Sequence, residues 1–201
     1  MIRITRHGLL GLHLLLAGCV SQPLQAPQPE PVLYRSHLEQ IARIDTFELQ
    51  GRIGVLTEKK GFSGLLRWYH NPQGDEIAFY SPLGSQIGQI SATRDSVTLT
   101  TSDQKTYTAN DAETLTRDTM GWSLPLYGLP DWALGRPSAG EARIMAWDIA
   151  GRILRMQQAG WDIEYGAYQD EQTGGLPAKV TLKSRELDLK LVIEQWRTAQ
   201  E

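Results

Sequence analysis

The segment Leu187-Asp188-Leu189-Lys190-Leu191-Val192-Ile193-Glu194-Gln195-Trp196, close to the end of the 201-residue chain, alternates apolar and polar side chains. In an extended strand, successive side chains point to opposite faces. Leu187, Leu189, Leu191 and Ile193 therefore share one face, while Asp188, Lys190 and Glu194 share the other. This pattern predicts a strand of an antiparallel sheet with one buried and one solvated face.

The same period of two recurs along most of the chain. From Phe47 to Val55 it places Phe47, Leu49, Ile53 and Val55 on one face, and Gly51 and Gly54 indicate a bend or bulge there. Polar, Pro-rich or Gly-rich turns separate the following segments, which makes antiparallel neighbours the expected arrangement. Further strands are predicted at 62–68, 76–80, 87–90, 96–101, 106–108, 152–157, 161–168, 178–184 and 187–196.

Two regions have a helical period instead. Apolar residues at three- and four-residue spacing predict an amphipathic helix over 32–44, and Asn110 with Glu113 predicts a capping box that opens a helix through about Thr119. A broken apolar run and a short helix containing Trp132 extend this insertion over about 110–136. We predict a mostly β (α+β) fold: an open, unclosed antiparallel β-barrel with an N-terminal helix and a helical lid enclosing an apolar cavity. No strand is assigned within 138–149.

The N-terminus reads as an export signal. Arg3 and Arg6 precede a short apolar run that ends at Leu16-Ala17-Gly18-Cys19, which resembles the lipobox of bacterial lipoproteins. The resemblance implies a signal peptide over residues 1–18, acyl chains covalently attached to Cys19, a flexible tether over 19–31 and a single domain over 32–201. The alternative is an ordinary signal followed by an incidental free cysteine.

Composition argues against several classes of function. Without residues 1–18 the chain keeps 18 basic and 23 acidic side chains, and this formal charge of −5 speaks against nucleic-acid binding. No Walker loop, G-x-S-x-G elbow, H-E-x-x-H or Cys-x-x-Cys motif occurs, so we expect neither an enzyme nor a metal site. The one serine–histidine combination that a lipid hydrolase could use is Ser63 or Ser85 with His70.

Exposed and aromatic apolar residues offer a different function. Tryptophans on predicted apolar faces either fill a core or line a cavity of the kind that lipocalin-type barrels enclose. Leu83 lies at the tip of the tight loop Ser81-Pro82-Leu83-Gly84-Ser85, where polar residues are usual. It either folds back onto the end of the barrel or projects far enough to enter a bilayer.

Motifs along the mature chain resemble the LolB family of outer-membrane lipoprotein receptors. The matching segments are Leu49-Gln50-Gly51-Arg52, Trp68, Ser81-Pro82-Leu83-Gly84, Tyr107 to Glu113, Leu124-Pro125-Leu126, Trp132-Ala133-Leu134-Gly135, Gly160-Trp161, Tyr165 and Leu176-Pro177-Ala178. Residues 138–149 match no family pattern. The resemblance implies an open barrel whose cavity binds acyl chains, and on it the cavity lining is expected to comprise Leu49, Ile53, Leu66, Trp68, Phe79, Trp122, Leu126, Trp132, Trp161, Leu189 and Leu191.

The resemblance also implies partners and a location. Such a protein is anchored through Cys19 to the periplasmic face of the outer membrane. It accepts lipoproteins from the periplasmic carrier LolA and inserts them into the inner leaflet of that membrane. On the same resemblance, Leu83 lies on the loop that contacts outer-membrane lipid. No cofactor beyond the acyl chains on Cys19 is implied, and we expect a monomer. The alternative is a structural lipoprotein that scaffolds the envelope and has no lipid cavity.

Overall fold

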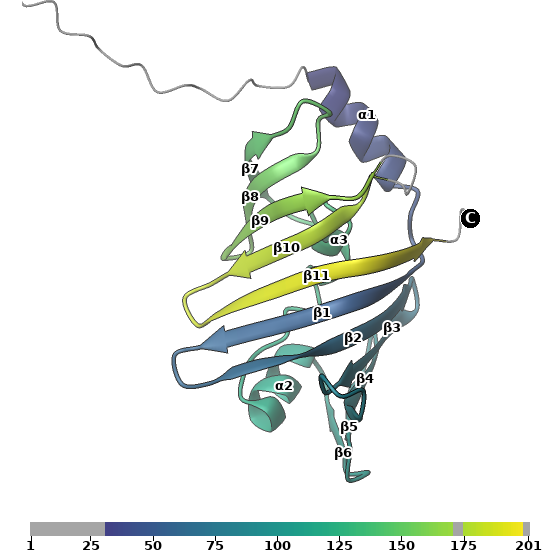
Figure 1. The fold of residues 1–201 in the computed structure, drawn as a ribbon, viewed down its shortest axis with the longest axis vertical. Helices are drawn as coiled ribbons and strands as arrows, with labels where there is room; N and C mark the ends of the chain where they lie inside the picture. Colours follow the sequence, from purple (N-terminus) through teal and green to yellow (C-terminus); the bar gives the residue numbers. More distant parts are fainter. Residues whose placement is uncertain (1–30, 171–174, 199–201) are drawn as a thin grey trace, which may run out of the picture.

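The alternating segments form one antiparallel sheet of eleven strands, in the order β6-β5-β4-β3-β2-β1-β11-β10-β9-β8-β7 (Figure 1). The computed structural model describes residues 31–170 and 175–198, so the predicted signal peptide, Cys19 and tether through residue 30 lie outside the described residues. The strands are β1 (Phe47–Thr57), β2 (Gly61–Asn71), β3 (Gly74–Tyr80), β4 (Gln86–Thr93), β5 (Val97–Thr101), β6 (Thr106–Ala109), β7 (Ala142–Trp147), β8 (Ile153–Gln158), β9 (Trp161–Tyr168), β10 (Pro177–Lys183) and β11 (Leu187–Thr198).

The sheet is curved but not closed, because β6 and β7 lie at its two edges and do not pair with each other. An open, mostly β fold was predicted, and this prediction is confirmed. The first and last strands pair at the centre of the sheet, with Val55 opposite Leu189. Their register shifts at Gln50/Gly51, where a Cβ on Gly51 would lie 2.1 Å from the Val192 carbonyl oxygen. The predicted bulge is therefore present at Gly51, and only glycine fits it.

Three helices accompany the sheet. Helix α1 (Pro31–Ile41) is shorter than the predicted 32–44 and lies beside the β7–β8 turn, where Tyr34 packs edge-on against Trp147 at 5.6 Å between ring centroids. Helices α2 (Ala112–Met120) and α3 (Leu129–Ala133) fall between β6 and β7 in the sequence. We call residues 112–133 the lid segment. Helix α2 contacts β5 and β6, whereas α3 contacts β10.

Two local predictions need correction. The N-cap of α2 is Asp111 rather than Asn110: its carboxylate accepts the Thr114 backbone N–H at 2.7 Å. Both residue types cap helices, so the sequence pattern placed the cap one position early. Residues 142–147, left unassigned, form the edge strand β7, whose register against β8 shifts twice and blurs the alternation. Within the described ranges, no helix has the length and apolarity needed to cross a bilayer.

Several connections emerge at the same end of the sheet. The β1–β2 turn (58–60), the β8–β9 turn (159–160) and the β10–β11 turn (184–186) lie there because Thr57 is opposite Leu187 and Asp162 is opposite Lys183. The β3–β4 loop (81–85) joins them, since Tyr80 pairs with Leu65 near the start of β2. We call this the hairpin end.

Candidate functional site

The inward face of the sheet and the lid segment together form an apolar interior. Ten of the eleven residues predicted to line a cavity are buried here, each no more than 8% exposed, and Trp161 is half-buried. They come from β1, β2, β3, β9, β11 and the lid segment, so the fold brings together residues that are far apart in the sequence. The ten are Leu49, Ile53, Leu66, Trp68, Phe79, Trp122, Leu126, Trp132, Leu189 and Leu191.

These side chains are tightly packed. Leu49, Phe79 and Leu189 have no accessible surface, which leaves no space for a water molecule beside them. Side-chain packing at this density is typical of protein interiors. An acyl chain therefore enters this interior only if the lid segment or one flank of the sheet moves away.

Hydrogen bonds to Trp132 hold the α3 half of the lid segment. The Trp132 indole N–H donates to Gln158 Oε1 at 2.8 Å, and the Tyr165 hydroxyl donates to the Trp132 carbonyl at 2.9 Å. Gln158 also accepts the Ser138 backbone N–H at 2.9 Å. Burial raises the pKa of Tyr165 well above its usual value, so this phenol stays a neutral donor. Gln158 was not predicted from the sequence, because a polar residue at a strand end carries no local signal.

A separate set of contacts holds the α2 half. The Thr116 hydroxyl donates to the Ala112 carbonyl at 2.7 Å and accepts the Leu124 backbone N–H at 2.9 Å. Trp122 stacks on Phe62 of β2, with ring centroids 6.3 Å apart and an interplanar angle of 22°. The lid segment is thus fastened to each flank of the sheet independently.

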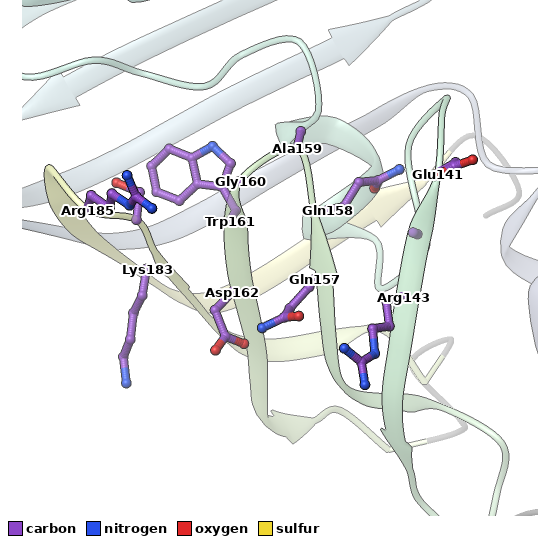
Figure 2. Close-up of a pocket in the computed structure, with 12 residues that line it drawn as sticks. Glu141, Arg143, Gln157, Gln158, Ala159, Gly160, Trp161, Asp162, Lys183 and Arg185 are labelled. Carbon is purple, nitrogen blue, oxygen red and sulfur yellow. The ribbon is translucent and has the colours of Figure 1, made fainter.

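A pocket of about 660 Å³ opens on the β7–β9 side of the hairpin end (Figure 2). Trp161 and Arg185 lie at one end of it and Arg143 at the other, with Gln157 and Asp162 between them. The Arg155 Nε donates to Asp162 at 2.9 Å, which neutralises that carboxylate and lowers its pKa. The Trp161 ring is 6.4 Å from that of Trp132, so this aromatic pair links the pocket to the buried interior.

Leu83 projects from the hairpin end. Its side chain is 96% exposed, so the alternative in which it folds back onto the barrel is wrong. The loop is closed by hydrogen bonds from the Ser81 N–H to the Ser85 carbonyl and from the Gly84 N–H to the Ser81 carbonyl, both 2.8 Å. Gly84 has φ +86°, a left-handed conformation that lets the chain turn immediately after Leu83.

The residues considered for hydrolysis do not meet. Seven positions along β2 separate Ser63 from His70, which is about 23 Å at 3.3 Å per residue, and Ser85 lies at the hairpin end with Ser63. His70 Nδ1 lies 2.8 Å from Asp75, whose carboxylate also accepts the Trp68 indole N–H at 2.7 Å. Among residues 31–170 and 175–198, no group of three or more His, Cys, Asp or Glu side chains is placed to hold a metal ion.

Comparison with known proteins agrees with this architecture. Residues 45–196 match the family model described as "Outer membrane lipoprotein LolB". The chain is 34% identical over 186 residues to the outer-membrane lipoprotein LolB of Thiobacillus denitrificans, covering 92% of both chains, and 30% identical over 186 residues to that of Pseudomonas savastanoi pv. phaseolicola, covering 91% of both. Among solved structures, a DUF1329 family protein from Desulfovibrio piger shares the fold, with a TM-score of 0.50 at 6% identity over 86% of this chain and 94% of that one. The protein whose sheet, lid segment and projecting leucine are described above belongs to the LolB family of outer-membrane lipoproteins.

Proposed function

We propose that this protein is the outer-membrane receptor that accepts lipoproteins from a LolA-type periplasmic carrier, holds their acyl chains in its apolar interior and inserts them into the inner leaflet. The observation that carries the proposal is the largely apolar inward face of the sheet, covered by a thin lid segment rather than by a second sheet. Family membership supports the same role. Acyl chains passed between two apolar sites gain or lose little free energy, so a small difference in affinity sets the direction of transfer.

The acyl-chain cavity forms when the lid segment moves. Helix α2 rests on the β5–β6 flank and α3 on the β10 flank, so separating the two flanks, or lifting one helix, parts the interior. Gly121, with φ +81°, and Gly128 bound the connection between the helices and allow it to change direction. Lid movements that admit a ligand occur in many binding proteins and enzymes.

Leu83 delivers the cargo by entering the bilayer. Because the side chain is already exposed, transferring it to the hydrocarbon region is worth about 1.5–3 kcal/mol. One leucine alone gives only a weak and reversible contact. Durable attachment comes from the acyl chains proposed on Cys19, since each buried methylene adds about 0.8 kcal/mol.

A transfer assay from loaded LolA to liposomes tests the proposal. Leu83→Glu is expected to leave folding and acceptance from LolA intact and to block release into liposomes, because an ionised carboxylate opposes entry into hydrocarbon. Ile149→Glu is the matched control: Ile149 is 82% exposed but lies in the β7–β8 turn, away from the hairpin end. Normal release by the Leu83 variant, or equal loss in both variants, would show that this loop has no special role at the membrane.

The packed interior also fits a structural lipoprotein that scaffolds the envelope without binding lipid. An apolar fluorescent probe separates the two functions. A receptor binds the probe and releases it when a lipopeptide is added, whereas a scaffold with a permanently closed core binds neither. Probe uptake that no lipopeptide can reverse would also count against the receptor.

A further inference from the structure

A second pocket at the hairpin end has a cationic rim. It has a volume of about 370 Å³ and lies between the β1–β2 turn, the end of α2 and the β10–β11 turn. Four basic side chains line it: Lys59, Lys60, Arg117 and Arg185. Glu58 and Glu186 line it too, which leaves a net charge of +2 in a chain whose formal charge is −3.

These four cations have no ion-pair partner within the described parts of the chain. Other basic side chains on the sheet do pair: Arg52 with Glu194 at 3.0 Å, and Arg197 with Glu48 at 3.1 Å. Like charges held close together repel one another, and a bound anion removes that repulsion. The cluster is therefore arranged for an anionic ligand rather than for an internal salt bridge.

Two of the cations are positioned by the fold. Arg117 Nε donates to Ser123 Oγ at 3.0 Å, which fixes the plane of the guanidinium and leaves its terminal nitrogens without a protein acceptor among the described residues. Lys60 lies against the left-handed C-cap of α2, because a Cβ on Gly121 would come within 2.6 Å of its ammonium nitrogen. Arginine and lysine bind phosphate well when they are held in this way.

The pocket lies close to the Leu83 loop. Trp122 on the pocket wall stacks on Phe62, and Phe62 meets Phe79 edge-on at 6.2 Å. Phe79 is one residue before Tyr80, where β3 ends and the loop begins. A Cβ on Gly64 would lie 2.5 Å from the Tyr80 carbonyl oxygen, so the loop leaves the sheet directly beside the start of β2. A surface that Leu83 enters is thus within reach of the cationic rim.

We propose that this cationic pocket binds the phosphate of an anionic phospholipid headgroup in the bilayer that Leu83 enters. The inference rests on the membrane contact proposed above and adds a lipid specificity to it. An exposed leucine at the same end of the sheet as lysines and arginines that lack ion-pair partners among the described residues matches the two layers of a membrane surface, hydrocarbon below and phosphate above. With Leu83 and the pocket both engaged, the hairpin end faces the membrane and the β10–β11 turn lies at the lipid surface.

Vesicle binding tests the proposal. We use the predicted mature chain, residues 19–201, with Cys19→Ala so that no acyl chain masks the contact. Vesicles contain either phosphatidylcholine alone or phosphatidylcholine with phosphatidylglycerol. Replacing Lys59, Lys60 and Arg185 by Gln is expected to weaken binding to the anionic vesicles by roughly 100-fold, since each basic residue near an anionic surface contributes about 5-fold. Binding to the neutral vesicles should not change.

The matched control replaces Arg35, Arg43 and Arg94 by Gln, which removes the same charge from exposed positions away from the pocket. Equal weakening by both triple variants would overturn the proposal in favour of a general charge effect. If the pocket binds free glycerol phosphate without vesicles, its ligand is a soluble phosphate rather than a lipid, and the proposal is wrong. If the triple variant slows transfer from LolA but leaves vesicle binding unchanged, the pocket contacts the carrier protein instead, and the proposal is again wrong. Leu83→Glu should weaken binding to both kinds of vesicle, whereas the pocket variant should weaken binding to the anionic vesicles alone. If Leu83→Glu has no effect on either kind of vesicle, the membrane contact is wrong; if only the pocket variant has no effect, the headgroup site is wrong.

Discussion

Tyr165→Phe should loosen the lid segment without damaging the sheet. The substitution removes one oxygen atom, whose hydrogen bond to the Trp132 carbonyl holds α3 against β9 at 2.9 Å. The carbonyl is then buried without that partner, and such a loss destabilises the closed arrangement by about 1–2 kcal/mol. This free energy corresponds to a roughly 5- to 30-fold larger population of the open lid.

Hydrogen exchange measures this opening directly. The amides of Trp132 and Leu134 donate within the α3 turn, to the carbonyls of Gly128 and Pro130 at 3.1 and 3.2 Å, so they exchange only when the lid segment opens. Both should exchange about 5- to 30-fold faster in Tyr165→Phe, while amides of the central β1–β11 pair stay protected. If lid opening limits acceptance, uptake of cargo from LolA should quicken as well.

Tyr168→Phe is a matched control on the same strand. The Tyr168 hydroxyl donates to the Ile153 carbonyl of β8 at 2.5 Å, so its loss affects the sheet rather than α3. Lid amides should therefore exchange at the wild-type rate in this variant. The reasoning is refuted if both variants accelerate the lid amides equally, or if Tyr165→Phe accelerates every amide in the protein to the same extent.

Two further predictions concern stability. Gly51→Ala should lower the free energy of unfolding by about 1–3 kcal/mol, because its Cβ would overlap the Val192 carbonyl oxygen. The control is Gly54→Ala in the same strand, whose Cβ meets no atom within 4 Å and which should leave stability unchanged. Equal melting temperatures for the two variants would contradict the bulge. Burial raises the pKa of both Tyr165 and Tyr168 in the folded protein. Above about pH 10 the phenols therefore ionise in the unfolded chain while they stay neutral in the folded one. The free energy of unfolding should then fall as the pH rises, by up to about 1.4 kcal/mol per pH unit for each phenol. Denaturant titrations from pH 9 to 11 check this, and the double Phe variant should show a shallower decline than wild type.

Strands with regular alternation were predictable from the sequence. The predicted segment 161–168 coincides with β9, and the alternation from Leu187 to Ile193 predicts the buried face of β11. A period of two is a local property, so it survives without knowledge of neighbouring strands. Strand β7 lacked that signal. Its register shifts against β8, and its position at the sheet edge leaves all six of its residues half-buried or exposed.

The interior was predictable as a set of residues, but its closure was not. The apolar strand faces identify Leu49 and Leu189 as inward-facing. Whether such faces enclose a void or pack tightly depends on the distance between the sheet and the lid segment, and no local sequence pattern encodes that distance. Gln158 and the cationic pocket were missed for a related reason. Arg117 and Arg185 are ordinary polar residues in their own segments, and only the fold places them in the same pocket.

The pairing of β1 with β11 has a consequence for biogenesis. Val55 and Leu189 are neighbours in the middle of the sheet although they are 134 positions apart in the chain. The central pair of strands, β1 and β11, therefore cannot form until the last strand has been synthesised. Contacts between such distant positions also slow folding. Truncation before Leu187 removes β11, so it should leave a product that proteases remove instead of a partly active one.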